Sequence, residues 1–370
     1  MSDPPRDRDQ DPDRDRTGEQ PQDHEQPRAE TETGTDDGAD ASEQVTSPGS
    51  TPGSAPATAE PPDHEAVQAD VERARQEIAK RIVGQENVVE GILVCLLCDG
   101  NALLESNPGL GKTTLVRTVA DVTGVSFSRI QCTPDLMPAD ITGTEVIRES
   151  GEGRTFRFEK GPVFANVVLA DEINRATPKT QAALLEAMEE KQVTAGGETY
   201  PLPRPFFLLA TQNPIEMEGV YPLPEAQIDR FMLKILVGYP NFDEEREIVD
   251  RYTERVDPEI PVEAVFGRER LQRAQDLVRQ VPIAEDLRDE VVSLVRRTRE
   301  VDRLEVGASP RASMALVLAA KARAFLRGRA YVEEADIEAM APPVLRHRIV
   351  LDFRAEREGI RPDDVIADLL

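Results

Sequence analysis

The residues with the clearest chemical potential lie in the segment Ser106–Thr114, which reads Ser-Asn-Pro-Gly-Leu-Gly-Lys-Thr-Thr. It follows an apolar run of strand length and opens a helical pattern, which is the setting of a phosphate-binding P-loop. Gly109 and Gly111 would let backbone N–H groups curve around a phosphate, and the start of the helix adds a positive dipole. In this pattern the Lys112 ammonium reaches the β and γ phosphates of ATP, and the Thr113 hydroxyl binds Mg²⁺.

One position departs from the pattern, because this chain has Ser106 where the motif has glycine. Ser106 stands at the entry to the loop, where a small residue can serve, so we expect the departure to bear on affinity rather than on the presence of the site. A chance glycine-rich turn is the alternative, and the carboxylates described next argue against it. The residues of this loop expected to contact the nucleotide are Asn107, Pro108, Gly109, Leu110, Gly111, Lys112, Thr113 and Thr114.

Two carboxylates, Asp171 and Glu172, follow the apolar segment Asn166–Ala170. A carboxylate at the carboxyl edge of a sheet beside a P-loop holds Mg²⁺, usually through water, and a neighbouring carboxylate can polarise the attacking water. We therefore expect Asp171 to hold the metal together with Thr113, and Glu172 to be catalytic. A strand that ends in Asp-Glu is usually structural when no other motif accompanies it. The P-loop in the same chain is the reason to favour a functional role for this pair.

A polar amide, Asn213, follows shortly after the apolar segment Phe206–Ala210. An amide at this edge of a sheet could position the attacking water or sense the γ phosphate. By itself, Asn-Pro is a turn signal. Beside the P-loop and the Asp-Glu pair we favour the catalytic interpretation of Asn213.

A parallel sheet would bring these residues together, and the hydrophobic pattern predicts one. Apolar runs of strand length alternate with helical patterns such as Lys112–Val122 and Lys179–Glu190, which indicates an α/β fold with a five-stranded parallel sheet between helices. From about Asn241 onward the pattern is helical, which predicts a smaller all-α domain. The predicted strands are Asn101–Glu105, Val125–Gln131, Asn166–Ala170, Phe206–Ala210 and Leu233–Val237. The predicted C-terminal helices are Asp243–Arg255, Arg268–Gln280, Ile283–Glu300, Arg311–Leu326 and Val332–Met340.

The N-terminal part of the chain has a different composition. Residues 1–65 contain 18 acidic and 5 basic residues, so they carry −13 of the net charge of −26. Large apolar residues are almost missing there, so we expect disorder. The expected organisation is a disordered acidic tail over residues 1–64, a nucleotide-binding α/β domain over 65–240 and a helical lid domain over 241–370. The sequence has neither a secretory signal nor an apolar run long enough to span a membrane, which favours a cytoplasmic protein.

The cysteines and histidines offer little chemistry. Cys95 and Cys98 form an isolated C-x-x-C in an apolar helical stretch, where two small buried side chains are expected rather than zinc. Two of the three histidines lie in the tail, so a histidine base or ligand set is not expected. The acidic composition favours a salt-loving host, with an acidic mesophilic protein as the alternative.

Together, the P-loop, the Asp-Glu strand, the Asn-ended strand and the helical C-terminal region resemble AAA+ ATPases. The detailed motifs are similar to those of the MoxR family over roughly residues 66–350, whereas the tail has no counterpart in the family pattern and Ser106 departs from it. The motifs that carry the resemblance are Thr133–Thr144, Ala170–Arg175, Ala210–Pro214, Tyr221–Phe231 and Gly307–Ser313.

The resemblance implies roles for two arginines and two apolar residues. Arg311 matches the second sensor, which touches the γ phosphate from the same subunit, and Arg230 matches the arginine finger, which enters the site of a neighbouring subunit. A guanidinium group can stabilise charge on the transferring phosphoryl group. Ile82 and Val83 match the segment against which adenine packs, and ordinary core packing at a helix end is the alternative for both.

Two further segments match insertions that face the substrate in related motors. Leu136–Lys160 matches an insertion into the second core helix, and Val193–Pro201 is typical of a β-hairpin with Gly-Gly at its turn. Inert surface loops are the alternative for both segments, and the sequence does not decide between them.

The resemblance also implies a function. It implies a Mg²⁺-dependent ATPase that forms a homo-oligomeric, hexameric ring and acts as a chaperone-like remodelling or maturation factor on partner proteins, including one with a von Willebrand factor A domain. A nucleic-acid motor is a second interpretation, but an acidic chain without a Lys/Arg-rich patch gains little from phosphate contacts, so no nucleic acid is expected. A nucleotide-dependent scaffold with little hydrolysis is a third interpretation, suggested by Ser106.

Overall fold

The computed structural model describes residues 64–150, 153–213, 219–253 and 260–370 of the chain. Except for His64, where the first helix begins, the segment expected to be a disordered acidic tail lies outside these residues. Within the described ranges, no helix has both the length and the apolar character that crossing a membrane requires.

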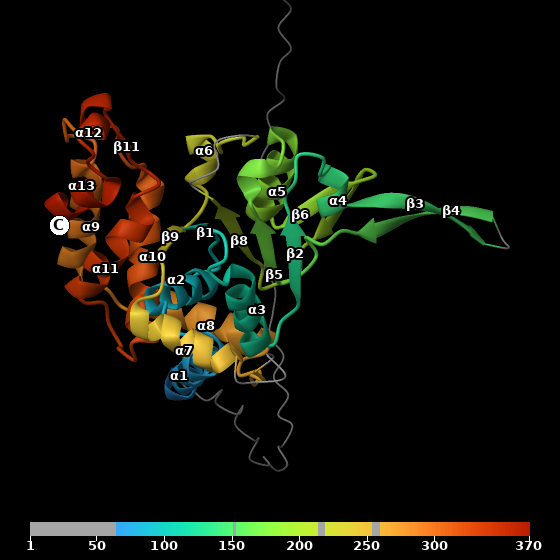
Figure 1. Cartoon of the computed structure of the whole chain (residues 1–370), viewed down its shortest axis with the longest axis horizontal. Coiled ribbons are helices and arrows are strands. Elements are labelled where there is room, and N and C mark those ends of the chain that lie inside the picture. The colour runs from blue at the N-terminus through green and yellow to red at the C-terminus, as the bar shows by residue number, and fades with distance from the viewer. Residues whose placement is uncertain (1–63, 151–152, 214–218, 254–259) are drawn as a thin grey trace, which may run out of the picture. The chain divides into compact units, whose positions relative to one another are not determined.

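The core is a sheet of five parallel strands in the order β2-β5-β8-β1-β9 (Figure 1). This confirms the predicted five-stranded parallel sheet, and the strand ends differ from the predicted ones by at most two residues. Because β8 lies between β5 and β1, the carboxyl ends of these three strands are neighbours at one edge of the sheet. The strands are β1 (Ala102–Ser106), β2 (Phe127–Gln131), β5 (Val167–Asp171), β8 (Phe207–Gln212) and β9 (Leu233–Val237).

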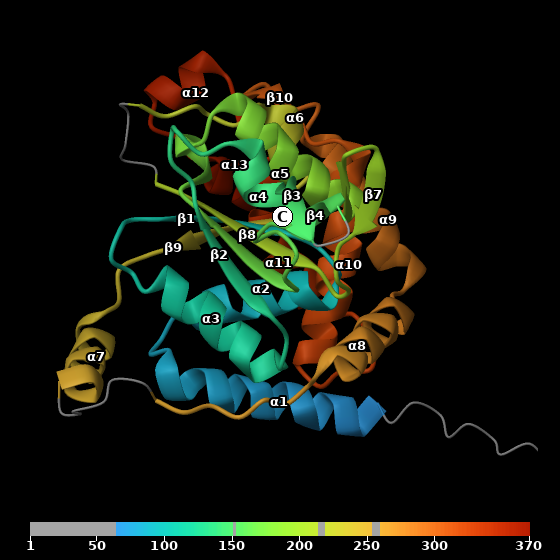
Figure 2. The ribbon, with the colours of Figure 1, turned by 90° about the vertical axis from the view of Figure 1, so that its right-hand side faces the viewer.

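Helices cover both faces of the sheet, as predicted (Figure 2). Successive side chains of a strand point to opposite faces. Leu104 and Leu169 therefore join one buried cluster with α2 and α3, while Leu103 and Ala170 join a second cluster with α5. The first helix, α1, packs against α3. The bounds are α1 (His64–Arg81), α2 (Glu86–Leu97), α3 (Lys112–Thr123) and α5 (Pro178–Glu190).

Two antiparallel hairpins occupy the predicted insertions. The short helix α4 (Pro138–Thr142) leads into β3 (Gly143–Ser150) and β4 (Gly153–Lys160), which extend away from the sheet (Figure 1). The predicted Gly-Gly hairpin is confirmed as β6 (Gln192–Ala195) and β7 (Glu198–Pro201). Its turn residues Gly196 and Gly197 have φ values of 60° and 82°, as tight two-residue hairpin turns require.

The C-terminal region is helical as predicted, and it adds the helices α12 and α13 and one pair of strands to the predicted elements. Strands β10 (Leu304–Val306) and β11 (Val350–Leu351) form a small antiparallel pair that the sequence analysis did not predict. The buried cluster that contains Cys95 and Cys98 of the α2 region continues through α8, α10 and α11, so both cysteines are core residues as expected. The expected domain boundary near residue 240 stays a prediction. The remaining helices are η1 (Ile173–Arg175), α6 (Glu225–Ile228), α7 (Phe242–Thr253), α8 (Arg268–Gln280), α9 (Glu285–Arg297), α10 (Pro310–Leu326), α11 (Glu334–Leu345), α12 (Phe353–Arg357) and α13 (Pro362–Leu369).

Candidate active site

The predicted P-loop connects β1 to α3. Gly109 and Gly111 have φ values of 84° and 72°, and a side chain added at either position would meet open space. Backbone conformation, rather than close packing, therefore requires glycine there. Ser106 is the buried last residue of β1, does not have a positive φ, and donates its hydroxyl to the Asn107 carbonyl at 2.8 Å. The departure from the motif at Ser106 therefore carries no conformational cost.

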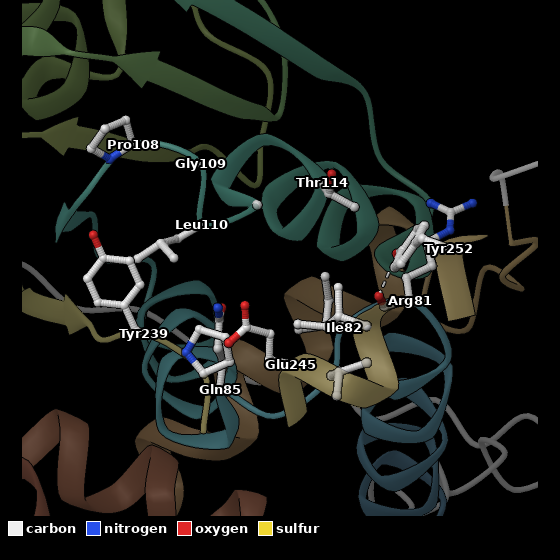
Figure 3. Close-up of a pocket in the computed structure, with 14 residues that line it drawn as sticks. Arg81, Ile82, Gln85, Pro108, Gly109, Leu110, Thr114, Tyr239, Glu245 and Tyr252 are labelled. Carbon is white, nitrogen blue, oxygen red and sulfur yellow. Dashed lines mark hydrogen bonds between the residues drawn. The ribbon is translucent and has the colours of Figure 1, made fainter. Parts of the chain in front are cut away.

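A cavity of about 430 Å³ opens between this loop and helix α7 (Figure 3). Seven residues expected from the sequence to contact nucleotide line it, and they come from two separate segments of the chain. The cavity thus joins the P-loop to the Ile82–Val83 segment, as a site that takes phosphates at one end and an apolar base at the other would need. The seven residues are Ile82, Val83, Pro108, Gly109, Leu110, Gly111 and Thr114.

The opposite wall of the cavity was missed by the sequence analysis. Glu245, Ile248 and Tyr252 lie three and four residues apart along α7, so they share one face of the helix, and Tyr239 and Pro240 line the cavity just before it. That spacing within the predicted helix was the signal that could have indicated these residues. The Tyr252 hydroxyl donates to the Arg81 carbonyl at 2.8 Å, which ties α7 to the end of α1.

Three of the ten residues expected to contact the nucleotide do not line the cavity. Lys112 and Thr113 are half-buried in the first turn of α3, and Asn107 lies between β1 and the loop glycines. Among the residues that the structure describes, no carboxylate pairs with the Lys112 ammonium. Its charge is therefore not neutralised by the described part of this chain.

The Asp171 carboxylate is held from two sides at the end of β5. The Thr211 hydroxyl of β8 donates to its Oδ1 at 2.7 Å, and Arg129 Nη2 of β2 donates to its Oδ2 at 2.6 Å. The side chain of Asp171 is buried, so both oxygens have a fixed direction. These contacts follow from the strand order, because β2 and β8 are the two neighbours of β5.

Glu172 adopts an unusual backbone conformation immediately after β5. Its φ of 57° is uncommon for a residue with a side chain and is found preferentially at functional sites. Its backbone N–H donates to the Thr211 hydroxyl at 2.9 Å. Its carboxylate accepts a hydrogen bond from Gln131 Nε2 at 3.3 Å and lies 3.4 Å from Arg175 Nη1.

The carboxylates also affect a neighbouring thiol. Burial raises the pKa of the Cys132 thiol to about 12, and the charges of Asp171 and Glu172 act in the same direction. Cys132 is therefore protonated at neutral pH and contributes no nucleophile to the site.

The sheet brings the P-loop, the carboxylate pair and Asn213 to a single edge. Asn213 is buried and directly follows β8, the strand between β5 and β1. Three expected components of the site therefore meet at the carboxyl ends of adjacent strands, as the sequence analysis required.

Arg230 and Arg311 form a separate cluster around Glu189. Arg230 pairs with Glu189, and Arg311 lies 3.7 Å from Glu189 Oε1 and 3.9 Å from Asp229 Oδ2. Arg230 precedes β9. The first residue of β9, Leu233, pairs with Ala102, the first residue of β1. This cluster therefore lies toward the amino edge of the sheet, whereas the P-loop follows the carboxyl end of β1.

The two edges are well separated along the strands. At about 3.3 Å per residue, a strand of five residues spans about 13 Å. The structure therefore does not bring Arg230 or Arg311 to Asp171 and Glu172 of the same chain. The expectation that Arg311 touches a γ phosphate bound by its own subunit gains no support from this placement.

Two family models match the chain. The model described as "ATPase family associated with various cellular activities (AAA)" matches residues 101–233, and the model described as "AAA lid domain" matches residues 296–369. The first range contains the P-loop, the Asp171–Glu172 pair, Asn213 and Arg230, and the second contains Arg311.

Individual proteins are similar over most of the chain. Chaperone MoxR1 of Mycobacterium tuberculosis is 48% identical over 324 residues, which cover 84% of this chain and 85% of that protein. Protein MoxR of Methylorubrum extorquens is 33% identical over 321 residues, which cover 79% of this chain and 91% of that protein. A crystal structure of an ATPase candidate from Cytophaga hutchinsonii matches with a TM-score of 0.78 at 40% identity, over 83% of this chain and 94% of that chain.

Proposed function

Because the chain belongs to the MoxR family of AAA+ ATPases, we propose that it hydrolyses ATP in order to remodel or mature partner proteins, as a chaperone-like factor. The cavity between the P-loop and α7 carries the proposal, because it joins a glycine-rich phosphate cradle to an apolar wall. The Asp171–Glu172 pair at the same edge of the sheet supplies the groups that hydrolysis requires.

The cavity and the adjacent Lys112 suit ATP at both ends. The backbone N–H groups of Gly109 and Gly111 and the Lys112 ammonium would bind the phosphates, whose negative charge Lys112 offsets. Ile82 and Val83 would pack against adenine from one side and Ile248 of α7 from the other. We therefore prefer the adenine-binding interpretation of Ile82 and Val83 to simple core packing.

The carboxylate pair would divide the chemistry between its members. Thr113 and Asp171 provide oxygen atoms of the kind that Mg²⁺ prefers, and bound Mg²⁺ would neutralise charge on the phosphates. Glu172 would orient the attacking water and accept its proton, while Asn213 would hold the water or the γ phosphate in line. Thr211 and Arg129 would keep the Asp171 carboxylate in place throughout.

We propose that Arg230 and Arg311 serve the site of a neighbouring copy. Both lie toward the edge of the sheet opposite their own P-loop, and both contact Glu189. A guanidinium group supplied by another copy would stabilise the charge that develops on the transferring phosphoryl group. This requires a homo-oligomer, and a hexameric ring is the arrangement that we propose.

The partners that we propose are proteins. Chaperone MoxR1 of Mycobacterium tuberculosis is named a chaperone, and the similarity extends over 84% of this chain. A protein substrate and a partner with a von Willebrand factor A domain remain our expectation, as does a cytoplasmic location. A net charge of −26 gives no reason to expect nucleic acid as a ligand.

A Lys112→Ala variant tests the nucleotide site directly. We expect wild-type protein to bind ATP and release phosphate in the presence of Mg²⁺, and the variant to do neither, because the ammonium offsets phosphate charge. Lys179→Ala is a matched control, since Lys179 is an exposed lysine in the first turn of α5. Wild-type affinity for ATP in the Lys112→Ala variant would contradict the assignment.

A further inference from the structure

Three consecutive residues after α11 form hydrogen bonds with the short segment that contains Arg230 or with its immediate neighbour in β9. This segment, residues 229–232, links α6 to β9 and belongs to neither. His347 Nε2 donates to the Phe231 carbonyl at 3.0 Å, and Arg346 Nη1 donates to the Lys234 carbonyl at 3.1 Å, just beyond the segment. Arg348 makes the largest share of the contacts.

The Arg348 guanidinium uses all five of its N–H donors. Nε donates to Asp229 Oδ1 at 2.8 Å, and Nη2 donates to the carbonyls of Asp229 and Phe231 at 3.2 and 2.6 Å. Nη1 donates to the Met232 carbonyl at 3.0 Å and also to the Val344 carbonyl of α11. Only 2% of the side chain is exposed. A planar five-donor fork is the one side chain that can make this set of contacts at once.

The contacts of Arg348 determine where the backbone on both sides of Arg230 lies. Local backbone hydrogen bonds and one to Asn101 hold the N–H groups of residues 229–232, whereas Arg348 binds the carbonyls of Asp229, Phe231 and Met232. Asp229, which Arg348 holds, also lies 3.9 Å from Arg311. The same buried guanidinium therefore supports the surroundings of both arginines.

We propose that Arg348 is a positioning residue for Arg230: it holds residues 229–232 so that the Arg230 guanidinium is presented to the site of a neighbouring copy. The inference rests on the proposed function, because it gives Arg230 its role in hydrolysis. It adds a physical link between the segment that joins α11 to β11, which contains Arg348, and catalysis in the next copy. A displacement of this region would therefore change hydrolysis in the neighbouring copy through Arg230 as well as through Arg311 of α10.

An Arg348→Lys variant tests this link. Lysine keeps the positive charge near Asp229 but cannot reach the carbonyls of Asp229, Phe231 and Met232 together. We expect ATP affinity to stay at the wild-type value, because Arg348 does not line the cavity. We expect kcat to fall by about 10- to 100-fold, as small displacements of catalytic groups do.

Arg323→Lys is the matched control for loss of a buried arginine contact. Arg323 lies in α10, has a side chain that is only 16% exposed, and pairs with Asp336 at 2.7 Å. It makes no contact with residues 229–232 that the structure describes. Its kcat per folded molecule should equal that of the wild type, with the folded fraction of each variant taken from thermal melting.

Subunit mixing separates positioning from a purely structural role. Arg348→Lys subunits retain an intact cavity, and Lys112→Ala subunits retain an intact Arg230 segment. Mixed assemblies therefore contain interfaces with both, and phosphate release should recover above that of either variant alone. Arg230→Ala mixed with Lys112→Ala is the reference, and Asp229→Asn is a second variant that should behave like Arg348→Lys if the latter does not fold.

The outcomes of these experiments distinguish a failure of the proposed function from a failure of the inference about Arg348. Absence of hydrolysis in the wild type would remove the proposed function itself. Recovery with Arg230→Ala but not with Arg348→Lys would overturn the inference alone, because the defect would then lie in the variant's own cavity. The inference would also be overturned if Arg348→Lys had the kcat of the wild type while Arg230→Ala had a reduced kcat.

Discussion

Thr211 connects the two carboxylates on which the proposed chemistry depends. Its hydroxyl donates to Asp171 at 2.7 Å and accepts the backbone N–H of Glu172 at 2.9 Å. Because Glu172 has a positive φ, its conformation needs support from neighbouring groups. One buried hydroxyl therefore holds both the Asp171 carboxylate and the backbone of Glu172.

A Thr211→Val variant should lose stability and activity together. Valine has nearly the same shape but leaves a carboxylate oxygen and an N–H group buried without a partner, which costs about 1–3 kcal/mol of unfolding free energy. We expect kcat to fall more than ATP affinity, since Thr211 does not line the cavity. Urea unfolding and steady-state phosphate release measure the two effects.

Thr211→Ser is the control, because serine keeps the hydroxyl. It should retain most of the activity that valine removes. Equal kcat in the valine and serine variants would show that the hydroxyl does not position the carboxylates.

The sequence indicates the residues that we propose to bind nucleotide and catalyse hydrolysis more readily than the residues that hold them in place. Local sequence patterns of a few positions are enough to identify Gly109, Lys112, Asp171 and Glu172. The role of Thr211 arises because β8 lies beside β5, and chain order does not reveal that adjacency. The sequence-based doubt about Ser106 disappears for a similar reason, since its backbone conformation became known only from the fold.

The elements that place the site differ in how far they could be predicted. The five strands are short apolar runs, and the sequence located each of them. The pair β10 and β11 has only three and two residues, which is too short for a periodic signal. Helix α7 was predicted as a helix, but which of its faces would line the cavity depends on how it docks.

The free energy of unfolding depends on pH through His347, which contacts residues 229–232. Burial lowers the pKa of His347 well below its usual 6.5, and the charge of Arg348 acts in the same direction. The unfolded chain takes up a proton near pH 6.5 while the folded chain does not. Stability is therefore fully present above pH 6.5 and is lost as the pH falls below it, by up to about 1.4 kcal/mol per pH unit.

A His347→Gln variant should remove this dependence. Glutamine can still donate an N–H to the Phe231 carbonyl but does not titrate. Between pH 7.5 and 5.5, we expect the unfolding free energy of the wild type to fall by about 1 kcal/mol more than that of the variant. Urea unfolding at several pH values measures the difference, and parallel curves would show that His347 does not titrate on unfolding.

At the scale of the whole molecule, the groups that we propose to be catalytic are divided between two edges of the sheet. The P-loop and the carboxylates lie at the carboxyl edge, and Arg230 lies toward the amino edge. Under the proposed roles, a single copy does not bring Arg230 to its own P-loop. This division is what a ring of identical subunits would resolve, since each interface would join one edge to the other.

The acidic N-terminal segment should be dispensable for folding and basal hydrolysis. Deletion of residues 1–62 removes only residues that precede α1, the first described helix. Their composition offers almost no apolar surface for packing on the core. We expect the melting temperature and basal phosphate release to stay at wild-type values, and a large drop in melting temperature would show that the segment packs on the core.

The central claim is that ATP is hydrolysed at the edge where the P-loop meets Asp171 and Glu172. A Glu172→Gln variant separates binding from hydrolysis, because it removes the carboxylate that would accept the proton of water but keeps Lys112, Thr113 and Asp171. The decisive measurement compares ATP affinity and phosphate release in the wild type and in this variant. We predict unchanged affinity and phosphate release that falls by about 100-fold or more. Wild-type turnover in Glu172→Gln would contradict the account.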